Sequence, residues 1–225
     1  MNQQHRVLII DDHPLICDSY KTALKEVMEQ RRDIQIKIET AGDSDSAREK
    51  IRNTQTENGW DLVFLDIRLP PSKDRRILSG EDLGEMIRQE HPLAKIIVAT
   101  TFNDNYRIQN IFKSLKPEGF LIKNDVDTPE LVEAILKIMQ GGVYHTSTVA
   151  NLMRKQAFTD INIDKMDRQI LYELSLGTKM KDLPKFVPLS IAGIEKRKRI
   201  LKQVFDVEDQ GDKALILKAR ELGFI

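Results

Sequence analysis

The sequence predicts an α/β doubly wound domain with five parallel strands, followed by a small all-α domain. Two observations carry this prediction. Before about residue 145, five short apolar runs rich in β-branched residues alternate with longer segments of helical period. From Asp164 onward every periodic segment is helical and no strand pattern appears. Repeated alternation of strands and helices is typical of a parallel sheet with helices on both faces.

The strand candidates differ in the spacing of their apolar residues. The second alternates polar and apolar residues, with Ile34, Ile36 and Ile38 on one face, which is typical of an edge strand with one wet face. The others are nearly continuous apolar runs, as expected for strands that are covered on both faces. The five candidates in chain order are Val7–Ile10, Ile34–Ile38, Leu62–Leu65, Ile96–Val98 and Phe120–Ile122.

Amphipathic helix signals follow these strands. Several segments open with capping residues, which are Asp43-Ser44, Ser79, Asp104, and Thr128 with Pro129 behind it. Gly141-Gly142 ends the last segment. The predicted helices cover residues 14–30, 44–56, 80–91, 104–115 and 128–140.

The C-terminal part contains a predicted helix–turn–helix. Helices are expected over residues 164–176, 182–187, 190–205 and 212–222, after a short connecting helix over Ser147–Gln156 and a boundary loop over Phe158–Ile163. Gly177 suits a left-handed C-cap and Ser190 an N-cap, while Pro184 falls in a first helical turn, where it removes no hydrogen bond. The predicted domains are residues 1–143, a linker with a short helix over 144–160, and a helical domain over 161–225.

Composition excludes several classes of protein. With 225 residues, of which 40% are hydrophobic and 31% charged, the chain is too apolar for wholesale disorder. A single cysteine, Cys17, and four scattered histidines exclude a disulfide scaffold and a Cys/His zinc site, so Cys17 is expected in packing rather than redox chemistry. No apolar run approaches the ~20 residues that cross a bilayer, and the N-terminus lacks a secretory signal. We therefore expect a cytoplasmic protein without a membrane segment.

Polar residues end the predicted strands. Because ligands of an open parallel sheet bind at the carboxyl ends of its strands, these side chains are expected to converge. Clustered carboxylates repel one another unless a cation lies among them, and an all-oxygen site that keeps waters suits Mg²⁺. Such a site would hold a carboxylate nucleophile, a metal that offsets phosphoryl charge, and a lysine clamp. The groups concerned are Asp11-Asp12, Asp66, Thr100-Thr101 and Lys123.

This pattern resembles the receiver domain of two-component response regulators, which has a flavodoxin-like fold. The resemblance covers roughly residues 5–142 and includes Pro70 four residues after Asp66 and Gly119–Lys123 closing the fifth strand. It implies that Asp66 accepts the phosphoryl group. It also implies that Asp11, Asp12, Asp66 and the carbonyl of Arg68 hold Mg²⁺ or, in its place, Mn²⁺. Thr100 would be the switch hydroxyl, Lys123 the phosphoryl clamp and Phe120 the switch aromatic.

Each of these residues alone has an ordinary structural explanation, such as a solvated turn or a core side chain. Their coincidence at the ends of correctly ordered strands favours the functional one. Next to the acids, His13 is expected to be a surface residue at a helix start rather than a ligand. A phosphatase would need a second carboxylate where Arg68 stands, and a dinucleotide-binding fold would need a Gly-rich turn after the first strand.

The chain departs from the usual receiver after Asp66. A glycine ordinarily follows the phosphoacceptor by about eight residues, whereas Gly80 follows Asp66 by fourteen. The excess lies in Pro71–Ser79, which contains Lys73, Arg75 and Arg76. This loop is either a benign insertion or a contact with the phosphorylation site or the kinase, and general tolerance of loop insertions favours the first explanation.

The C-terminal region resembles a LuxR/NarL-type helix–turn–helix DNA-binding domain from Ile163 to Val207. It departs from that family at Asp167, at Leu183-Pro184 and at Gly193–Arg197. Residues 179–202 hold eight Lys or Arg residues against two acids, which favours nucleic acid over a merely solvated helix face. By position, the resemblance implies that Glu195, Lys196 and Arg199 face base edges and that Arg197, Lys198 and Lys202 meet phosphates.

The resulting hypothesis is a phosphorylation-dependent transcriptional regulator of a two-component system, not an enzyme beyond its own phosphoryl acceptance and loss. Its expected partners are a sensor histidine kinase and double-stranded DNA, which it would bind as a homodimer. Two alternatives stay open. The helical domain of a phospho-switched interaction protein could bind protein or RNA, or the chain could be a DNA-binding dimer that is independent of phosphorylation.

Overall fold

The computed structural model describes residues 3–53, 59–101, 105–155 and 163–225. Its contacts cluster in two compact units, one formed by residues 1–103 with 114–155 and the other by residues 104–113 with 156–225. The expected cap Asp104 and most of the expected boundary loop 158–163 lie outside the described residues. The exact domain boundaries stay a prediction.

The first unit is built on a parallel sheet whose strands run in the order β2-β1-β3-β4-β5-β6. The order reverses between β1 and β3, which is the switch point where such sheets bind ligands. The half-polar β2 lies at the edge, as its alternating pattern predicts. The strands are β1 (Gln3–Ile10), β2 (Ile34–Ala41), β3 (Leu62–Asp66), β4 (Lys95–Thr100), β5 (Gly119–Ile122) and β6 (Tyr144–His145).

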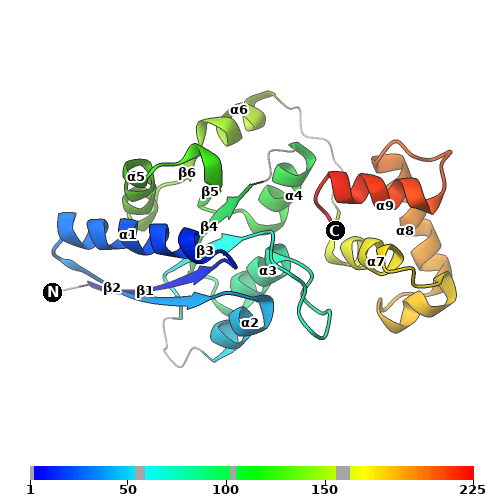
Figure 1. The fold of residues 1–225 in the computed structure, drawn as a ribbon, viewed down its shortest axis with the longest axis horizontal. Helices are drawn as coiled ribbons and strands as arrows, with labels where there is room; N and C mark the ends of the chain where they lie inside the picture. The colour runs from blue at the N-terminus through cyan, green and yellow to red at the C-terminus, as the bar shows by residue number, and fades with distance from the viewer. Residues whose placement is uncertain (1–2, 54–58, 102–104, 156–162) are drawn as a thin grey trace. The chain divides into compact units, whose positions relative to one another are not determined.

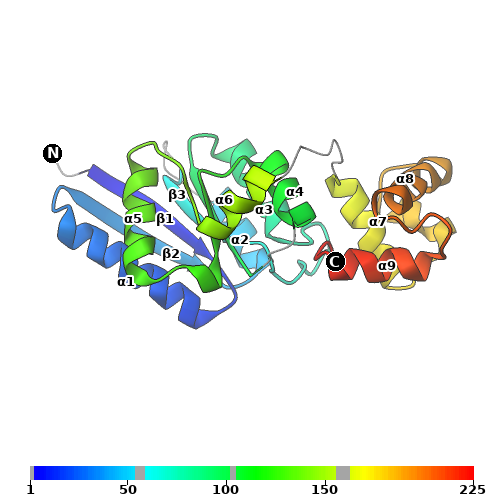
Figure 2. The ribbon, with the colours of Figure 1, turned by 90° about the horizontal axis from the view of Figure 1, so that it is seen from above.

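Helices cover both faces of the sheet. Figures 1 and 2 show α1 and α5 side by side along one face and α2 and α3 along the other. Alternate strand residues such as Val7, Ile9 and Phe64 pack under α1 and α5 in one core, while Leu8, Ile10 and Leu65 are equally buried. The helices of this unit are α1 (Pro14–Gln30), α2 (Ser44–Arg52), α3 (Gly80–Glu90), α5 (Thr128–Met139) and α6 (Ser147–Lys155). Most of α4 (Asn105–Leu115) belongs to the second unit.

The sheet has six strands rather than the five that the sequence predicts. β6 lies in the segment that was expected to be linker, and it pairs in parallel with β5. Tyr144 donates its N–H to the carbonyl of Glu118, and Thr146 donates to that of Phe120. Two residues form too short a run to show a strand period, and backbone hydrogen bonding to the open edge of β5 decides the conformation. The predicted short helix follows as α6.

The second unit contains α7 (Lys165–Ser175), η2 (Met180–Lys185), α8 (Ile191–Val204) and α9 (Asp212–Glu221). Two small apolar clusters hold these helices together, one around Leu171, Phe205 and Phe224 and the other around Ile170 and Ile194. Gly177 has the predicted left-handed backbone with φ of 80°, and Ser190 caps α8 by accepting the N–H of Gly193. This arrangement confirms the expected all-helical C-terminal region.

One helix of this unit differs from its prediction. The segment expected at 182–187 is a 3-10 helix that starts at Met180, and Pro184 lies inside it rather than in the first turn of an α-helix. Asp182 donates its N–H to the carbonyl of Lys179, three residues before it. A proline disturbs the longer-range α-helical bonding, and a short run of i→i+3 bonds avoids that cost.

Among the described residues, no helix is both long enough and apolar enough to cross a membrane.

Gly80 allows the chain after the inserted segment to return against the end of β3. A Cβ atom at this position would lie 1.8 Å from the carbonyl oxygen of Asp66, whereas one at Gly42 would meet nothing within 4 Å. We expect Gly80→Ala to lower the free energy of unfolding by about 2 kcal/mol through overpacking, and Gly42→Ala to change it by much less. Urea denaturation of the two variants measures both values, and equal losses would contradict this account of Gly80.

Candidate functional site

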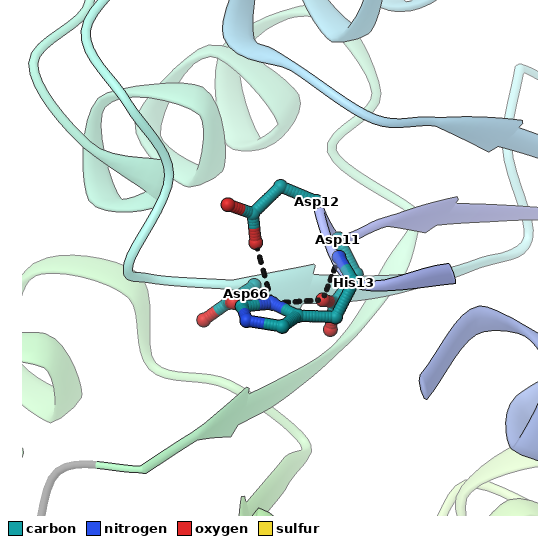
Figure 3. Close-up of side chains that lie close together, drawn as sticks. All are labelled: Asp11, Asp12, His13 and Asp66. Atoms are coloured by element: carbon teal, nitrogen blue, oxygen red, sulfur yellow. Dashed lines mark hydrogen bonds and ion pairs between the residues drawn. The ribbon is translucent and has the colours of Figure 1, made fainter. Parts of the chain in front are cut away.

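An acidic cluster lies at the carboxyl end of the sheet, beside the switch point. β1 and β3 are neighbours in register, with Ile10 opposite Leu65, so the residues that follow these positions meet. Asp11, Asp12, His13 and Asp66 place one nitrogen or oxygen atom each within 4.8 Å of one another (Figure 3). Asp11 and Asp66 are buried, whereas Asp12 is exposed at the rim. The convergence that the sequence predicts for these carboxylates is confirmed.

Lys123 closes the buried side of this cluster. It follows β5 in a short 3-10 helix, η1 (Lys123–Asp125), and its side chain is only 6% exposed. The Nζ atom lies 2.7 Å from Oδ2 of Asp11 and 2.7 Å from Oδ2 of Asp66. One ammonium thus bridges carboxylates from two strands. Because burying an unpaired carboxylate is costly, this contact offsets part of the cost of burying both acids inside the domain.

Burial and neighbouring charges shift the pKa values of Asp66 and Lys123. Burial raises the pKa of Asp66, the carboxylate of Asp11 adds to this effect, and the ammonium of Lys123 and the N–H of Arg68 oppose it. Burial acts to lower the pKa of Lys123, but its bonds to Asp11 and Asp66 hold that pKa above its ordinary value. The site therefore keeps a positive group beside Asp66 at physiological pH.

Backbone hydrogen bonds fix the direction of both buried carboxylates. The N–H of Arg68 donates to Oδ1 of Asp66 at 2.9 Å, and the N–H of His13 donates to Oδ1 of Asp11 at 3.0 Å. Each carboxylate thus uses one oxygen for the backbone and the other for Lys123. These contacts hold the two buried acids in one geometry.

The donor set fits a small divalent cation. Three carboxylates supply hard oxygen ligands close to one another, and the exposed Asp12 leaves one side of the cluster facing solvent. The backbone of Arg68 already contacts Asp66, which places that residue at the same rim. A carbonyl ligand from Arg68 stays a prediction.

Some basic residues of the helical unit are exposed on α8, and others are paired with acids of the same unit. Glu195, Lys196 and Arg199 are exposed on α8, as their predicted role at base edges requires. Arg197 instead donates to Asp164 at 2.8 Å and to Asp167 at 2.9 Å. Lys198 and Lys202 lie 2.9 and 3.0 Å from the carboxylate of Asp212. Their predicted phosphate contacts stay predictions, but acids of the same unit already compete for these cations.

Comparison with known proteins identifies the first unit. Residues 7–136 match the family model of the response regulator receiver domain. The chain belongs to this family. The match covers more than half of the chain and includes both buried acids and Lys123, so the expected resemblance to a receiver is confirmed.

Similar proteins extend over nearly the whole chain. The transcriptional regulatory protein MctR of Rhizobium johnstonii is 28% identical over 200 residues, which cover 88% of this chain and 86% of the relative. A nitrate/nitrite response regulator homologue of Haemophilus influenzae is 26% identical over 186 residues, with 81% of each chain covered. A solved structure of RcsB from Salmonella enterica serovar Typhimurium, bound to promoter rprA in the presence of the phosphomimetic BeF3⁻, aligns with a TM-score of 0.64. The alignment covers 96% of this chain and 98% of that chain at 20% identity, which shows the shared fold.

The two expected switch residues of the receiver lie on neighbouring strands. Thr100 ends β4, and Phe120 lies in β5 opposite Val98. Both side chains are fully buried. The backbone carbonyl of Phe120 also accepts the N–H of Thr146, which follows β6. This hydrogen bond connects β5 to the segment after β6. Their switching roles stay predictions.

The inserted loop of the receiver is folded against α2. The hydroxyl of Ser72 donates to Asp74 at 2.7 Å and lies in a buried position. Arg48 of α2 donates to Asp74 at 2.7 Å, and Asp45 accepts the N–H of Lys73. The hydrogen bonds from Ser72 and Arg48 lower the pKa of Asp74. The loop is therefore a structured addition next to α2, and contact with a kinase stays a hypothesis.

His13 lies at the start of α1, as the sequence predicts, and its ring contacts the rim of the acidic cluster. The residue is the N-cap of α1 and its side chain is 65% exposed, as expected, yet its imidazole Nδ1 lies 2.6 Å from Oδ1 of Asp12 (Figure 3). Pro14 supplies the missed signal. A proline restricts the preceding residue to extended backbone, and this keeps His13 beside the strand end instead of in the helix.

Lys123→Met should destabilise the receiver, because it leaves Asp11 and Asp66 buried without their ammonium. We expect a loss of about 3 kcal/mol in the free energy of unfolding without divalent ions, and a smaller loss with saturating MgCl₂. Lys21→Met is the control, since Lys21 pairs with Asp18 only at the surface. Denaturant titration with and without MgCl₂ measures these values. A Lys123 variant as stable as the control would contradict the bridging role.

Arg197→Ala should destabilise the helical unit by about 1–2 kcal/mol, because it removes the partner of the mostly buried Asp167. Lys196→Ala is the control, since its side chain is exposed on the same helix. Thermal unfolding of both variants measures the difference. If the two variants unfold alike, Arg197 does not fix α8 to α7.

Proposed function

We propose that this protein is a phosphorylation-dependent transcriptional regulator, in which phosphoryl transfer to Asp66 controls DNA binding by the helical unit. The observation that carries the proposal is the buried pocket itself, where one ammonium lies 2.7 Å from both Asp11 and Asp66. Over most of its length the chain is similar to a transcriptional regulatory protein and to a nitrate/nitrite response regulator homologue. This similarity supports the proposal that the helical unit regulates transcription.

Asp66 acts as the nucleophile. One oxygen of its carboxylate attacks the phosphorus atom of a phosphodonor, and the bond to the leaving group breaks as the acyl phosphate forms. Lys123 turns from the carboxylate to a phosphoryl oxygen and offsets the added negative charge. Asp11, Asp12, Asp66 and the carbonyl of Arg68 would hold Mg²⁺, which would offset negative charge on the phosphoryl group. The catalytic power of the chain is limited to the gain and loss of its own phosphoryl group.

Phosphorylation then shifts the receiver between two conformations. Thr100 approaches the new phosphoryl oxygens, and Phe120 fills the space that this movement leaves. A change from mostly inactive to mostly active requires differential stabilisation of about 5.5 kcal/mol. A few charge-assisted hydrogen bonds to phosphate provide energy of this order. The natural phosphodonor is a sensor histidine kinase, as the receiver family implies.

DNA recognition is assigned to α8. Its exposed Lys196 and Arg199 are available for bases or phosphates, and Glu195 is a candidate acceptor for cytosine. Arg197 is assigned mainly to the contact between α7 and α8, since both of its acidic partners come from the start of α7. One recognition helix makes few contacts, so the protein binds paired half-sites as a homodimer in the cytoplasm. RcsB dimers on DNA have been solved with the same fold.

Arg199→Ala tests base recognition. If Arg199 contacts a base, the variant loses about 1–3 kcal/mol of binding free energy on the cognate site and little on mixed-sequence DNA. If it contacts a phosphate, binding to all sequences weakens alike and the salt dependence becomes shallower. Fluorescence anisotropy at several salt concentrations distinguishes these results. Unchanged binding to every DNA would remove Arg199 from the interface.

The function as a whole is tested by DNA binding with and without a phosphoryl mimic. Labelled genomic duplex fragments and single-stranded RNA are titrated with the protein, alone and with beryllofluoride and MgCl₂. We expect the mimic to increase affinity for duplex DNA at least tenfold and to promote dimers, with no such response in Asp66→Asn. Preferential binding to RNA would favour the interaction-protein alternative. A DNA-binding dimer that ignores both the mimic and the substitution would show independence from phosphorylation.

A further inference from the structure

Two lysines of the helix α8 share one carboxylate. The Nζ atom of Lys198 lies 2.9 Å from Oδ2 of Asp212, and the Nζ atom of Lys202 lies 3.0 Å from Oδ1 of the same group. Lys202 also donates a hydrogen bond to the backbone carbonyl of Gln210 at 2.8 Å. The two lysines are four residues apart, so their side chains lie on the same face of the helix. Each oxygen of Asp212 is therefore occupied by one ammonium.

The start of α9 holds Asp212 in place. Asp212 is the first residue of α9, where the helix dipole favours a negative charge. Leu201 of α8 and Leu215 of α9 belong to the same apolar core, which keeps the two helices together (Figure 1). Burial acts to raise the pKa of Asp212, but the hydrogen bonds from Lys198 and Lys202 hold that pKa below its ordinary value. The carboxylate therefore stays ionised at physiological pH and retains both ammonium groups.

Neighbouring cations of α8 have a different environment. Lys196 and Arg199 are exposed, whereas the side chains of Lys198 and Lys202 are only 19% and 17% exposed. An exposed cation can approach DNA without first losing a protein contact. A lysine that is held by a carboxylate must exchange one ion pair for another, so it gains little from a phosphate.

This difference bears on how tightly the helical unit binds DNA of any sequence. Each phosphate that a cation neutralises releases counterions and strengthens binding irrespective of sequence. Contacts with base edges, by contrast, distinguish one sequence from another. While Asp212 holds two of the α8 lysines, these lysines add little to the sequence-independent affinity.

We propose that Asp212 is a positioning residue that keeps Lys198 and Lys202 from DNA phosphates and so lowers the sequence-independent affinity of the helical unit for DNA. The proposal rests on the proposed binding of DNA by this unit. It replaces the phosphate contacts that the resemblance to a helix–turn–helix domain implies for the two lysines. Release of these lysines would add two phosphate contacts to those of the exposed cations.

Titrations of the full-length protein with a mixed-sequence duplex at several salt concentrations test this assignment. They are carried out with beryllofluoride and MgCl₂ present and followed by fluorescence anisotropy. Asp212→Asn removes the charge of the side chain and keeps its shape. Asp209→Asn is the matched control, because Asp209 is an exposed acid three residues earlier and the change in net charge is the same.

We expect Asp212→Asn to bind the duplex about tenfold more tightly at low salt. The slope of log Kobs against log salt should steepen by about 1.8, since two more phosphates are neutralised. Asp209→Asn should have much smaller effects, and replacement of both lysines by glutamine in the Asp212→Asn protein should abolish the gain. A gain no larger than that of Asp209→Asn, or one that survives the loss of both lysines, would overturn the proposal.

A variant with Lys198→Gln and Lys202→Gln but with Asp212 intact gives a second test that does not depend on the folding of Asp212→Asn. Its salt slope should stay close to that of wild type, because the lysines make no phosphate contacts while Asp212 holds them. A slope that becomes shallower by about 1.8 would show existing phosphate contacts and overturn the proposal. Wild-type protein that binds no duplex DNA would contradict the proposed function itself, whereas duplex binding that ignores Asp212→Asn would reject only the role of Asp212.

Discussion

The contact of one buried ammonium with two buried carboxylates is the constraint on which the rest of this structure depends. Lys123 lies after β5, Asp11 after β1 and Asp66 at the end of β3, so the contact requires the central strands to be in the correct order and register. Burial raises the pKa of Asp66, and the ammonium counteracts this effect. The same side chain that stabilises the acids is therefore positioned to stabilise a phosphoryl group added to one of them.

The loop after Asp66 and the strand β6 extend the receiver without disrupting the contact of Lys123 with the two acids. The inserted loop after Asp66 is held by Ser72 and by Arg48 of α2, and Gly80 then brings the chain back against the carbonyl of Asp66. At the other side of the sheet, β6 covers the edge of β5, where Phe120 lies. The carbonyl of Phe120 accepts the N–H of Thr146, so β5 is bonded to the segment that follows β6.

The sequence predicted the fold and the acidic pocket well because both depend on regular patterns. Apolar runs located the strands, and the residues that end them defined the pocket. Sequence patterns did not predict the features that depend on particular tertiary contacts. The two residues of β6 show no period, and Pro184 lies inside a 3-10 helix instead of starting an α-helix. The partners of Arg197 lie about 30 residues away at the start of α7, and only the folded chain shows that the ring of His13 turns toward Asp12.

The most direct measurement of the central claim is the intact mass of the protein after incubation with a small phosphodonor and MgCl₂. The account predicts a gain of one phosphoryl group in wild type, lost on treatment with alkali as expected for an acyl phosphate, and no gain in Asp66→Ala. A wild-type protein that gains no phosphoryl group, or an Asp66→Ala variant that gains one equally well, would contradict it.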